Sequence, residues 1–314
     1  MDTFKNNFQK VWDDKCSKYD YIPDVLPAVN RIIVLGDIHG DYNKMIDMLK
    51  IGKVIDSKNN WIGGETVVVQ VGDQIDSCRS DGSFHCHQPQ DNDDDNDVEI
   101  LYFMTELHKK AQEYGGAVYS IMGNHELMNV QGDFSYVSHN NYINFKHGKY
   151  TGEEGRYNAF QPGNEIASFL ACTRKMALVI GSNLFVHAGI IDSISSKYHI
   201  TDLNEILTKY LLGMNIGMDS FNDLFTPHKQ SPMWNRTLAN GDCSALSKTL
   251  SSYNVGRLYV GHTPQLTKGI ESRCNRKLWL TDIGVSKAFK KFGGNNIVQV
   301  LEITNDKTIK VLMA

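Results

Sequence analysis

Short apolar runs, most of them rich in β-branched residues, recur along this chain and are separated by segments with a different spacing of apolar positions. Arg31 to Leu35, Thr66 to Val71 and Ala117 to Met122 each predict a buried strand. Between them, apolar residues at three- and four-residue spacing predict helices from Asp41 onward and from Val98 to Glu113. The first half of the chain therefore predicts alternating strands and helices.

The second half is richer in expected strands. Its last apolar run is followed by the turn signal Asn305-Asp306 and by another apolar run, which predicts a terminal hairpin. Alternating elements that give way to strands predict an α/β fold with two packed sheets and helices outside them. The elements expected in this half are a helix at 164–173, strands at 177–180 and 184–186, a helix near 202–213, and strands before Gly261, before Asp282 and at 297–303.

Five short motifs follow these apolar runs. Each places a carboxylate, a carboxamide or an imidazole where a strand ends and a loop can aim a side chain at a cleft. Oxygen and nitrogen ligands without thiolate suit Mn, Fe or Zn better than a structural zinc. Five such motifs in series predict a hydrolytic site that holds two metal ions. The motifs are Gly36-Asp37-Ile38-His39-Gly40, Gly72-Asp73-Gln74-Ile75-Asp76, Gly123-Asn124-His125-Glu126, His187-Ala188-Gly189 and Gly261-His262-Thr263-Pro264.

At these motifs the chain resembles the metallophosphoesterase superfamily and, within it, the phosphoprotein phosphatases. It is most similar to the bacterial-type, Shewanella-like branch, through the stretches Met122 to Val130, Arg156 to Gly163 leading to Phe185–Gly189, and Leu280 to Ser286. The resemblance implies the calcineurin-like α/β fold, a sandwich of two mixed β-sheets flanked by helices. It also implies two divalent metal ions, with Mn, Fe and Zn as candidates.

The resemblance assigns roles to residues that match the family motifs. Asp73 is expected to bridge the two metals, His125 to be the general acid, and Asp76 to orient His125. All six ligand positions hold the required residue type. Asp37, His39 and Asp73 are the expected ligands of one metal, and Asp73, Asn124, His187 and His262 those of the other.

The arginines that would bind phosphate oxygens depart from the eukaryotic pattern. Ser77 stands where an arginine follows the second motif, and Met122 where one precedes the third. Arg79 is expected to reach the same oxygens if its loop bulges, with a solvated loop arginine as the alternative. Arg236 lies in a Trp-Asn-Arg stretch that resembles the phosphate-contacting segment of phage and bacterial phosphatases. Arg156 is a further candidate from the Shewanella-like pattern, with a salt bridge as the alternative.

The spread of the motifs also predicts the domain organisation. Residues 31–314 are expected to form a single catalytic domain, because ligands from 37 to 262 must meet at one site. Residues 1–30 are expected to be an N-terminal arm, since two prolines disfavour helix after a first helical stretch. The segment 77–97 carries an acidic run and is expected to be a loop insertion over the site. A polar segment at about 137–160 is expected to form a cap that governs substrate choice.

Composition excludes several partners. With a net charge of −4 in 314 residues, the chain has no basic footprint for nucleic acid. No apolar run reaches the length that spans a bilayer.

The six cysteines, at 16, 78, 86, 172, 243 and 274, lack C-x-x-C spacing, which suggests reduced thiols and a cytoplasmic protein. Cys78, His85, Cys86 and His87 share one loop, where scattered side chains are favoured over an extra metal site.

The residues and the resemblance together predict a metal-dependent protein phosphatase, a phosphoric monoester hydrolase. A hydroxide that bridges two metals is expected to attack the phosphorus directly, and the sequence holds no C-x5-R nucleophile loop. The substrate is expected to be a phosphoprotein or phosphopeptide. Phosphotyrosine and phosphoserine or phosphothreonine both stay open, with a lean toward dual or tyrosine activity because phenoxide leaves more readily. The alternatives are a diadenosine polyphosphate hydrolase and a scaffold that binds phosphoproteins without turnover.

Overall fold

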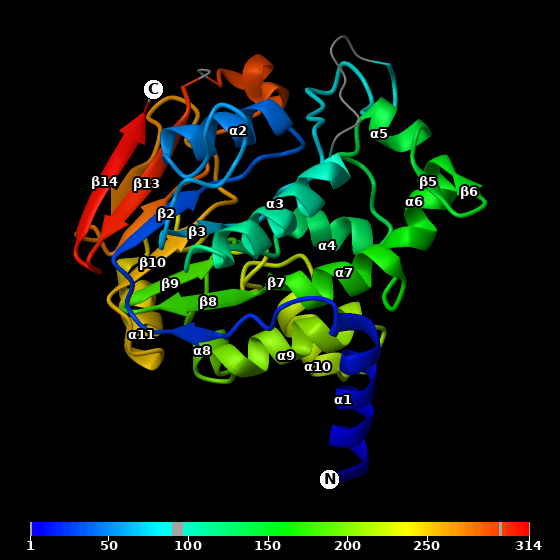
Figure 1. Ribbon diagram of the computed structural model, residues 1–314, viewed down its shortest axis with the longest axis horizontal. Coiled ribbons are helices and arrows are strands. Elements are labelled where there is room, and N and C mark those ends of the chain that lie inside the picture. The colour runs from blue at the N-terminus through cyan, green and yellow to red at the C-terminus, as the bar shows by residue number, and fades with distance from the viewer. Residues whose placement is uncertain (1, 90–96, 295–296, 314) are drawn as a thin grey trace.

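Two six-stranded mixed sheets lie face to face, with helices on both outer sides (Figure 1). The computed structural model describes residues 2–89, 97–294 and 297–313. The sheets combine parallel and antiparallel pairs. The predicted α/β sandwich of two mixed sheets flanked by helices is therefore confirmed.

The first sheet has the order β14-β13-β2-β3-β4-β7. Strands β2, β3 and β4 pair in parallel at its middle, and the terminal hairpin predicted from the sequence adds β13 and β14 at one edge. Side chains of β2 alternate, so that Ile33 and Leu35 pack under helices while Ile32 and Val34 face the other sheet. The strands are β2 (Arg31–Leu35), β3 (Val67–Gln70), β4 (Ala117–Ile121), β7 (Arg174–Lys175), β13 (Gln299–Thr304) and β14 (Thr308–Met313).

The second sheet has the order β1-β8-β9-β10-β12-β11. Its centre is the parallel set β9, β10 and β12, so the carboxyl ends of these strands meet at one edge, as those of β2, β3 and β4 do in the first sheet. Phe185 and Tyr259 stack between the sheets with ring centroids 5.0 Å apart. The strands are β1 (Val25–Leu26), β8 (Ala177–Ile180), β9 (Asn183–Val186), β10 (Arg257–Val260), β11 (Glu271–Arg273) and β12 (Leu278–Leu280).

Helices cover the outer face of each sheet. Helices α2 and α3 pack on the first sheet, and α7, α9 and α11 on the second (Figure 1). The first helix after β2 begins where the Asp41 carboxylate accepts a hydrogen bond from the Lys44 amide, at 3.1 Å. The helices are α1 (Asp2–Cys16), α2 (Tyr42–Ile51), α3 (Asp97–Gln112), α4 (Asn124–Val130), α7 (Glu165–Thr173), α8 (Asp192–Ser195), α9 (Ile200–Leu211), α10 (Met218–Phe225), α11 (Cys243–Ser252) and the 3-10 helix η1 (Lys287–Phe292).

Two segments stand out from the sandwich. Helix α1 of the N-terminal arm projects from the body, and the arm then adds β1 in parallel to β8 (Figure 1). The segment expected as a cap folds into α5 (His139–Ile143), the hairpin β5 (Lys146–His147) and β6 (Tyr150–Thr151), and α6 (Gly152–Phe160). It lies beyond the ends of α3 and α4, away from the sheets (Figure 1).

All six cysteines form disulfides, which corrects the expectation of reduced thiols. The partners are 156, 8 and 31 residues apart, so spacing along the chain gives no sign of the pairing that folding creates. The expected cytoplasmic location rested on reduced thiols, so it loses this support and stays a prediction. The pairs are Cys16–Cys172, Cys78–Cys86 and Cys243–Cys274, with Cα atoms 5.2, 5.6 and 5.4 Å apart.

The described residues include no helix with both the length and the apolar character needed to cross a bilayer.

Candidate active site

The ligand-type residues meet where the carboxyl ends of strands from both sheets converge. Asp37, Asp73 and Asn124 follow β2, β3 and β4 of the first sheet. His187 and His262 follow β9 and β10 of the second. Because parallel strands end at the same edge, residues far apart in sequence come together there. All six residues predicted as metal ligands are buried: Asp37, His39, Asp73, Asn124, His187 and His262.

Several loops at the site hold an unusual backbone conformation. His39, Asp73, Asp76 and His262 all have positive φ angles, of 45°, 54°, 69° and 64°. This left-handed region costs roughly 1–2 kcal/mol for a residue with a side chain. Such conformations persist only where the surrounding structure enforces them, and they concentrate at functional sites.

Asp73 is the centre of the cluster. Its Oδ1 lies 3.3 Å from His187 Nε2, and its Oδ2 lies 3.7 Å from His39 Nε2. It belongs to two groups whose ligand atoms all lie within 4.8 Å of one another, one with His39 and His125 and one with His187 and His262. A carboxylate placed between two such groups is suited to bridge two cations.

The cluster leaves buried polar atoms that a cation would satisfy. Among the described residues, Asp37 Oδ1, His262 Nε2 and Asp282 Oδ2 are buried side-chain atoms without a hydrogen-bond partner. Burying a polar atom unpaired is costly, and burying an unpaired charge costs more. Two of these atoms belong to predicted ligands, so the residues present fit a pair of divalent metal ions.

The pKa shifts describe the same surplus of buried charge. Burial raises the pKa of Asp37 well above its usual range, and nearby Asp282 and Asp73 add to this. Burial alone would also raise the pKa of Asp73, but His187 and His125 hold it well below its usual range. Burial raises the pKa of Asp282 to about 6. Several carboxylates lie close together in the buried site, and bound cations would reduce the repulsion between them.

Asp282 was not predicted as a site residue. It is 1% exposed, follows β12 and raises the pKa of Asp37 by its charge. Its position directly after an apolar run is the signal that sequence reasoning could have used. Asp282 therefore extends the acidic wall of the site.

His125 and Asp76 form a close pair, as the resemblance implied. His125 Nδ1 lies 2.8 Å from Asp76 Oδ2. Asp76 Oδ1 accepts a hydrogen bond from Asn129 Nδ2 at 2.9 Å, and Asn129 also bonds the His125 carbonyl. His125 Nε2 lies 3.8 Å from Asp73 Oδ2, so the ring directs its second nitrogen at the ligand cluster. Asn129, one helical turn after His125, is a support that the sequence analysis missed.

Glu126 holds the loop that carries Asp73. Its carboxylate accepts hydrogen bonds from the backbone amides of Gly123, Gln74, Asp73 and Ile75, at 2.8, 2.7, 3.1 and 3.2 Å. A Cβ atom at Gly123 would lie 2.2 Å from the Asp73 amide nitrogen, so only glycine allows this approach. The glutamate was visible in the third motif, but its role depends on the loop that it contacts.

Arg79 lies against the cluster. Its Nη2 lies 2.8 Å from His39 Nδ1 and 3.1 Å from His125 Nε2. The guanidinium carbon lies 5.0 and 5.1 Å from the ring centroids of Tyr136 and Phe289. The loop thus brings the arginine to the histidines despite serine at position 77. Tyr136 and Phe289 were not predicted as site residues, because single aromatic residues outside the motifs gave no distinctive signal.

Arg236 and Arg156 occupy different positions. Arg236 is exposed beside the site and donates from Nη1 to the carbonyl of His262 at 2.5 Å. Arg156 is fully buried, and its Nη2 lies 2.7 Å from Asp97 Oδ2 while Nε donates to Asn129. It stands behind Asp76, 3.7 Å from Oδ1. The structure therefore corrects the expectation of a phosphate-binding Arg156, because its donors are spent on buried partners.

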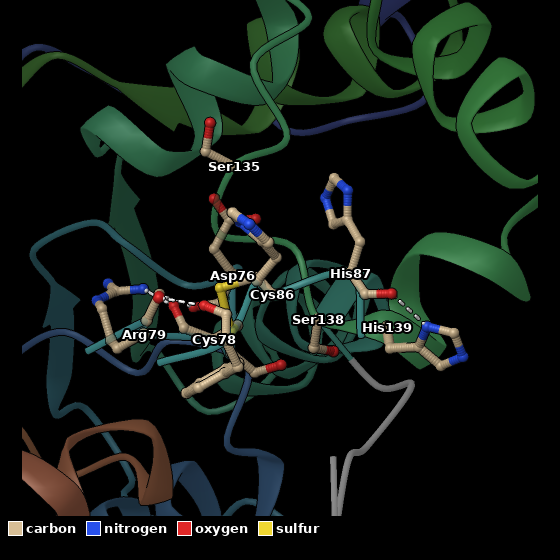
Figure 2. Close-up of a disulfide and its surroundings, with 12 residues drawn as sticks. Asp76, Cys78, Arg79, Cys86, His87, Ser135, Ser138 and His139 are labelled. Carbon is tan, nitrogen blue, oxygen red and sulfur yellow. Dashed lines mark hydrogen bonds between the residues drawn. A yellow bond between two sulfur atoms is a disulfide. The ribbon is translucent and has the colours of Figure 1, made fainter. Parts of the chain in front are cut away.

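The loop after Asp76 carries Cys78, Arg79, Cys86 and His87 (Figure 2). Cys78 and Cys86 join its two sides, so their sulfurs are not free thiolates for an extra metal site. The acidic run falls largely on residues 90–96, outside the described residues. Asp97, the last residue of that run, begins α3 and pairs with Arg156.

Comparison with known proteins agrees with this geometry. The calcineurin-like phosphoesterase family matches residues 30–266. A protein of Acanthamoeba polyphaga mimivirus is 39% identical over 247 residues, covering 68% of this chain and 98% of the viral protein. Shewanella-like protein phosphatase 1 of Plasmodium berghei is 31% identical. The alignment covers 92% of this chain and 76% of the Plasmodium protein.

A solved structure shares the fold. The cold-active protein-tyrosine phosphatase of a psychrophilic Shewanella species superposes with a TM-score of 0.67 at 24% identity, over 93% of this chain and 83% of that one. The family match includes all five motifs and ends at Leu266, shortly after the last of them. The chain belongs to the calcineurin-like phosphoesterase family and is a homologue of the Shewanella-like protein phosphatases.

Proposed function

We propose that this chain is a metal-dependent protein phosphatase that hydrolyses phosphomonoesters on proteins. The observation that carries the proposal is the position of Asp73, which belongs to both groups of ligand-type residues and lies beside the His125–Asp76 pair. A bridging carboxylate and an imidazole able to donate a proton are components of phosphomonoester hydrolysis. Homology to Shewanella-like protein phosphatases supports a phosphoprotein as substrate.

Two divalent cations fit the ligand cluster. When bound, they would neutralise charge on the phosphate and lower the pKa of water. Asp73 is placed to fix their spacing, and the imidazoles to complete each set without thiolate. Manganese, iron and zinc all accept such oxygen and nitrogen ligands. The proposed ligands are Asp37, His39 and Asp73 for one ion, and Asp73, Asn124, His187 and His262 for the other.

His125 is the proposed proton donor to the leaving oxygen. Asp76 Oδ2 lies 2.8 Å from Nδ1, and this contact orients the ring. The Nε2 proton then points toward the cluster, where the leaving oxygen of a bound phosphomonoester would lie. Asn129 and Arg156 contact the other carboxylate oxygen of Asp76, Oδ1, and so fix the carboxylate that orients His125.

Arg79 and Arg236 are the proposed phosphate-binding residues. Arg79 approaches beside His39 and His125, whereas Arg236 approaches beside His262. The two guanidinium groups therefore flank the cluster from the sides of different metal ligands. Each offers paired donors that suit the oxygens of a phosphate dianion.

Phosphotyrosine is the substrate class that we favour, together with phosphothreonine at a lower rate. Phenoxide is a better leaving group than an alkoxide and depends less on protonation. Tyr136, 37% exposed, stands beside His125 with ring centroids 5.0 Å apart, and an aromatic leaving group could pack against it. A cold-active relative with this fold is named as a protein-tyrosine phosphatase.

The test is phosphate release from paired phosphotyrosine and phosphothreonine peptides. Chelator-stripped protein is assayed with and without added Mn²⁺, and metal binding is measured in parallel. We expect metal-dependent release, faster from phosphotyrosine. Release from neither peptide, with metal bound, would overturn the proposal. Cleavage of a diadenosine polyphosphate would then point to a dinucleotide hydrolase, and tight peptide binding without turnover to a scaffold.

A further inference from the structure

We propose that the Cys78–Cys86 disulfide positions Arg79, so that phosphate binding depends on this bond. The proposal rests on the proposed function, since it concerns how that site holds its substrate. Position 77, where the eukaryotic pattern has an arginine, holds a serine and so provides no guanidinium group. The chain instead uses a residue two positions later, and the loop must bulge to bring it back to the histidines.

The disulfide closes that bulge. It joins residues eight positions apart, with Cα atoms 5.6 Å from each other, and both cysteines are 4% exposed. Arg79 directly follows the first cysteine. Figure 2 shows the arginine leaving the chain beside the disulfide and bonding back to the Asp76 and Cys78 carbonyls, at 3.3 and 2.6 Å. The bond therefore restrains the backbone from which the guanidinium extends.

The second cysteine is fixed to the cap. The neighbouring His87 stacks on Tyr142 with ring centroids 3.8 Å apart, and its Nε2 lies 2.9 Å from the Phe134 carbonyl. The His87 carbonyl lies 2.7 Å from His139 Nδ1 (Figure 2). The disulfide thus connects the start of the arginine loop to an anchored segment rather than to a mobile one.

The residues between the cysteines supply little support of their own. Ser80, Asp81 and Ser83 are exposed, and their hydrogen bonds are made inside the loop. Phe84 contacts Lys291 of η1 through a cation–π interaction at 4.5 Å. A loop with so few contacts to the rest of the protein would lose conformational entropy when substrate binding orders Arg79. A disulfide restrains the loop before substrate binds, so less entropy is lost on binding.

The guanidinium group of Arg79 contacts two aromatic side chains. The ring centroids of Tyr136 and Phe289 lie 5.0 and 5.1 Å from the guanidinium carbon, and the Cys78 amide donates to the Tyr136 carbonyl at 3.2 Å. The same short segment therefore carries the arginine, the disulfide and the contact to an aromatic partner. Releasing the disulfide should free all three together while leaving the buried ligand cluster in place.

The experiment compares the double variant Cys78→Ser/Cys86→Ser with Cys16→Ser/Cys172→Ser, a matched control that removes the disulfide between α1 and α7. Affinity for inorganic phosphate is measured by calorimetry on metal-loaded protein, alongside KM and kcat for a phosphotyrosine peptide, metal content and thermal unfolding. We expect Cys78→Ser/Cys86→Ser to weaken phosphate binding and raise KM by about tenfold, with a smaller change in kcat. The control should change neither.

The decisive comparison removes the disulfide from a protein that already lacks Arg79. In an Arg79→Ala background, removal of Cys78 and Cys86 should have no further effect on phosphate affinity, because the group that the disulfide positions is already missing. An equal loss in that background would overturn the proposal and assign the disulfide to general folding. Unchanged phosphate affinity in folded Cys78→Ser/Cys86→Ser would overturn it too.

The calorimetric arm separates this proposal from the proposed function. If the unsubstituted protein binds phosphate but releases none from peptides, the phosphatase assignment fails. The dependence of phosphate affinity on the disulfide and Arg79 still confirms or overturns the positioning role. Mild reduction of the unsubstituted protein, followed by thiol alkylation and mass mapping, gives the same comparison without substitution and guards against a variant that does not fold.

Discussion

The ligand cluster and the loop at residues 77–89 lie side by side but are held in different ways. The cluster lies at the ends of strands from two sheets, and its loops are fixed by buried groups such as Glu126. The 77–89 loop has no strand or helix, and the Cys78–Cys86 disulfide closes it on itself. Convergent strands can place side chains without covalent help, whereas a loop at the surface needs another restraint.

Removal of the bridging carboxylate tests the cluster and should have the largest effect. We expect Asp73→Asn to lower metal-dependent phosphate release by about 1,000-fold or more, because both proposed cations lose a ligand. Activity and bound metal are measured together, with Asp219→Asn, at an exposed position on α10, as the matched control. Full metal content with full activity in Asp73→Asn would remove this residue from the centre of the site.

Replacement of the proposed acid separates proton transfer from metal binding. His125→Asn should keep its metal and lose about 100- to 1,000-fold in kcat. The loss should grow as the leaving group becomes poorer, so rates are measured on aryl phosphates with phenols of different pKa. A loss that is equal for good and poor leaving groups would contradict the role of His125 as acid.

Arg79 tests the loop side of the comparison. Arg79→Ala should weaken phosphate binding by about 10- to 100-fold, as expected for a charged hydrogen bond to a dianion. Metal content should stay unchanged, because the cluster is built on other elements. Arg79→Lys is the matched variant and should recover part of the affinity, since lysine keeps the charge but not the paired donors. A loss of metal in Arg79→Ala would show that loop and cluster are not independent.

Arg156 should affect stability more than catalysis. Arg156→Met leaves Asp97 buried and unpaired, so we expect a loss of about 3–5 kcal/mol in the free energy of unfolding. Molecules that remain folded should keep activity within about tenfold. Urea unfolding and assays at low temperature measure the two effects. Arg156→Met/Asp97→Asn should be less destabilised than the sum of the single variants, and strict additivity would deny the pairing.

The comparison also marks what could be predicted from sequence. Strands β2, β3 and β4 follow from local apolar patterns, and the residues just after them are fixed by short motifs. Arg156 was misassigned because a buried arginine paired with Asp97 has the same sequence neighbourhood as one facing a phosphate. Arg79 depended on whether its loop bulges, and the pairing of Cys78 with Cys86 that shapes the bulge exists only in the folded chain.

The disulfide between Cys16 and Cys172 makes half of the protein a covalent ring. It joins positions 156 residues apart, and the ring contains Asp37, Asp73 and Asn124. A protease that cuts the exposed turn at Gly148 would therefore leave two fragments attached to each other. The nicked chain should migrate as one species on a gel without reductant and as two fragments with it. A single cleavage inside this ring cannot release one set of ligands from the other.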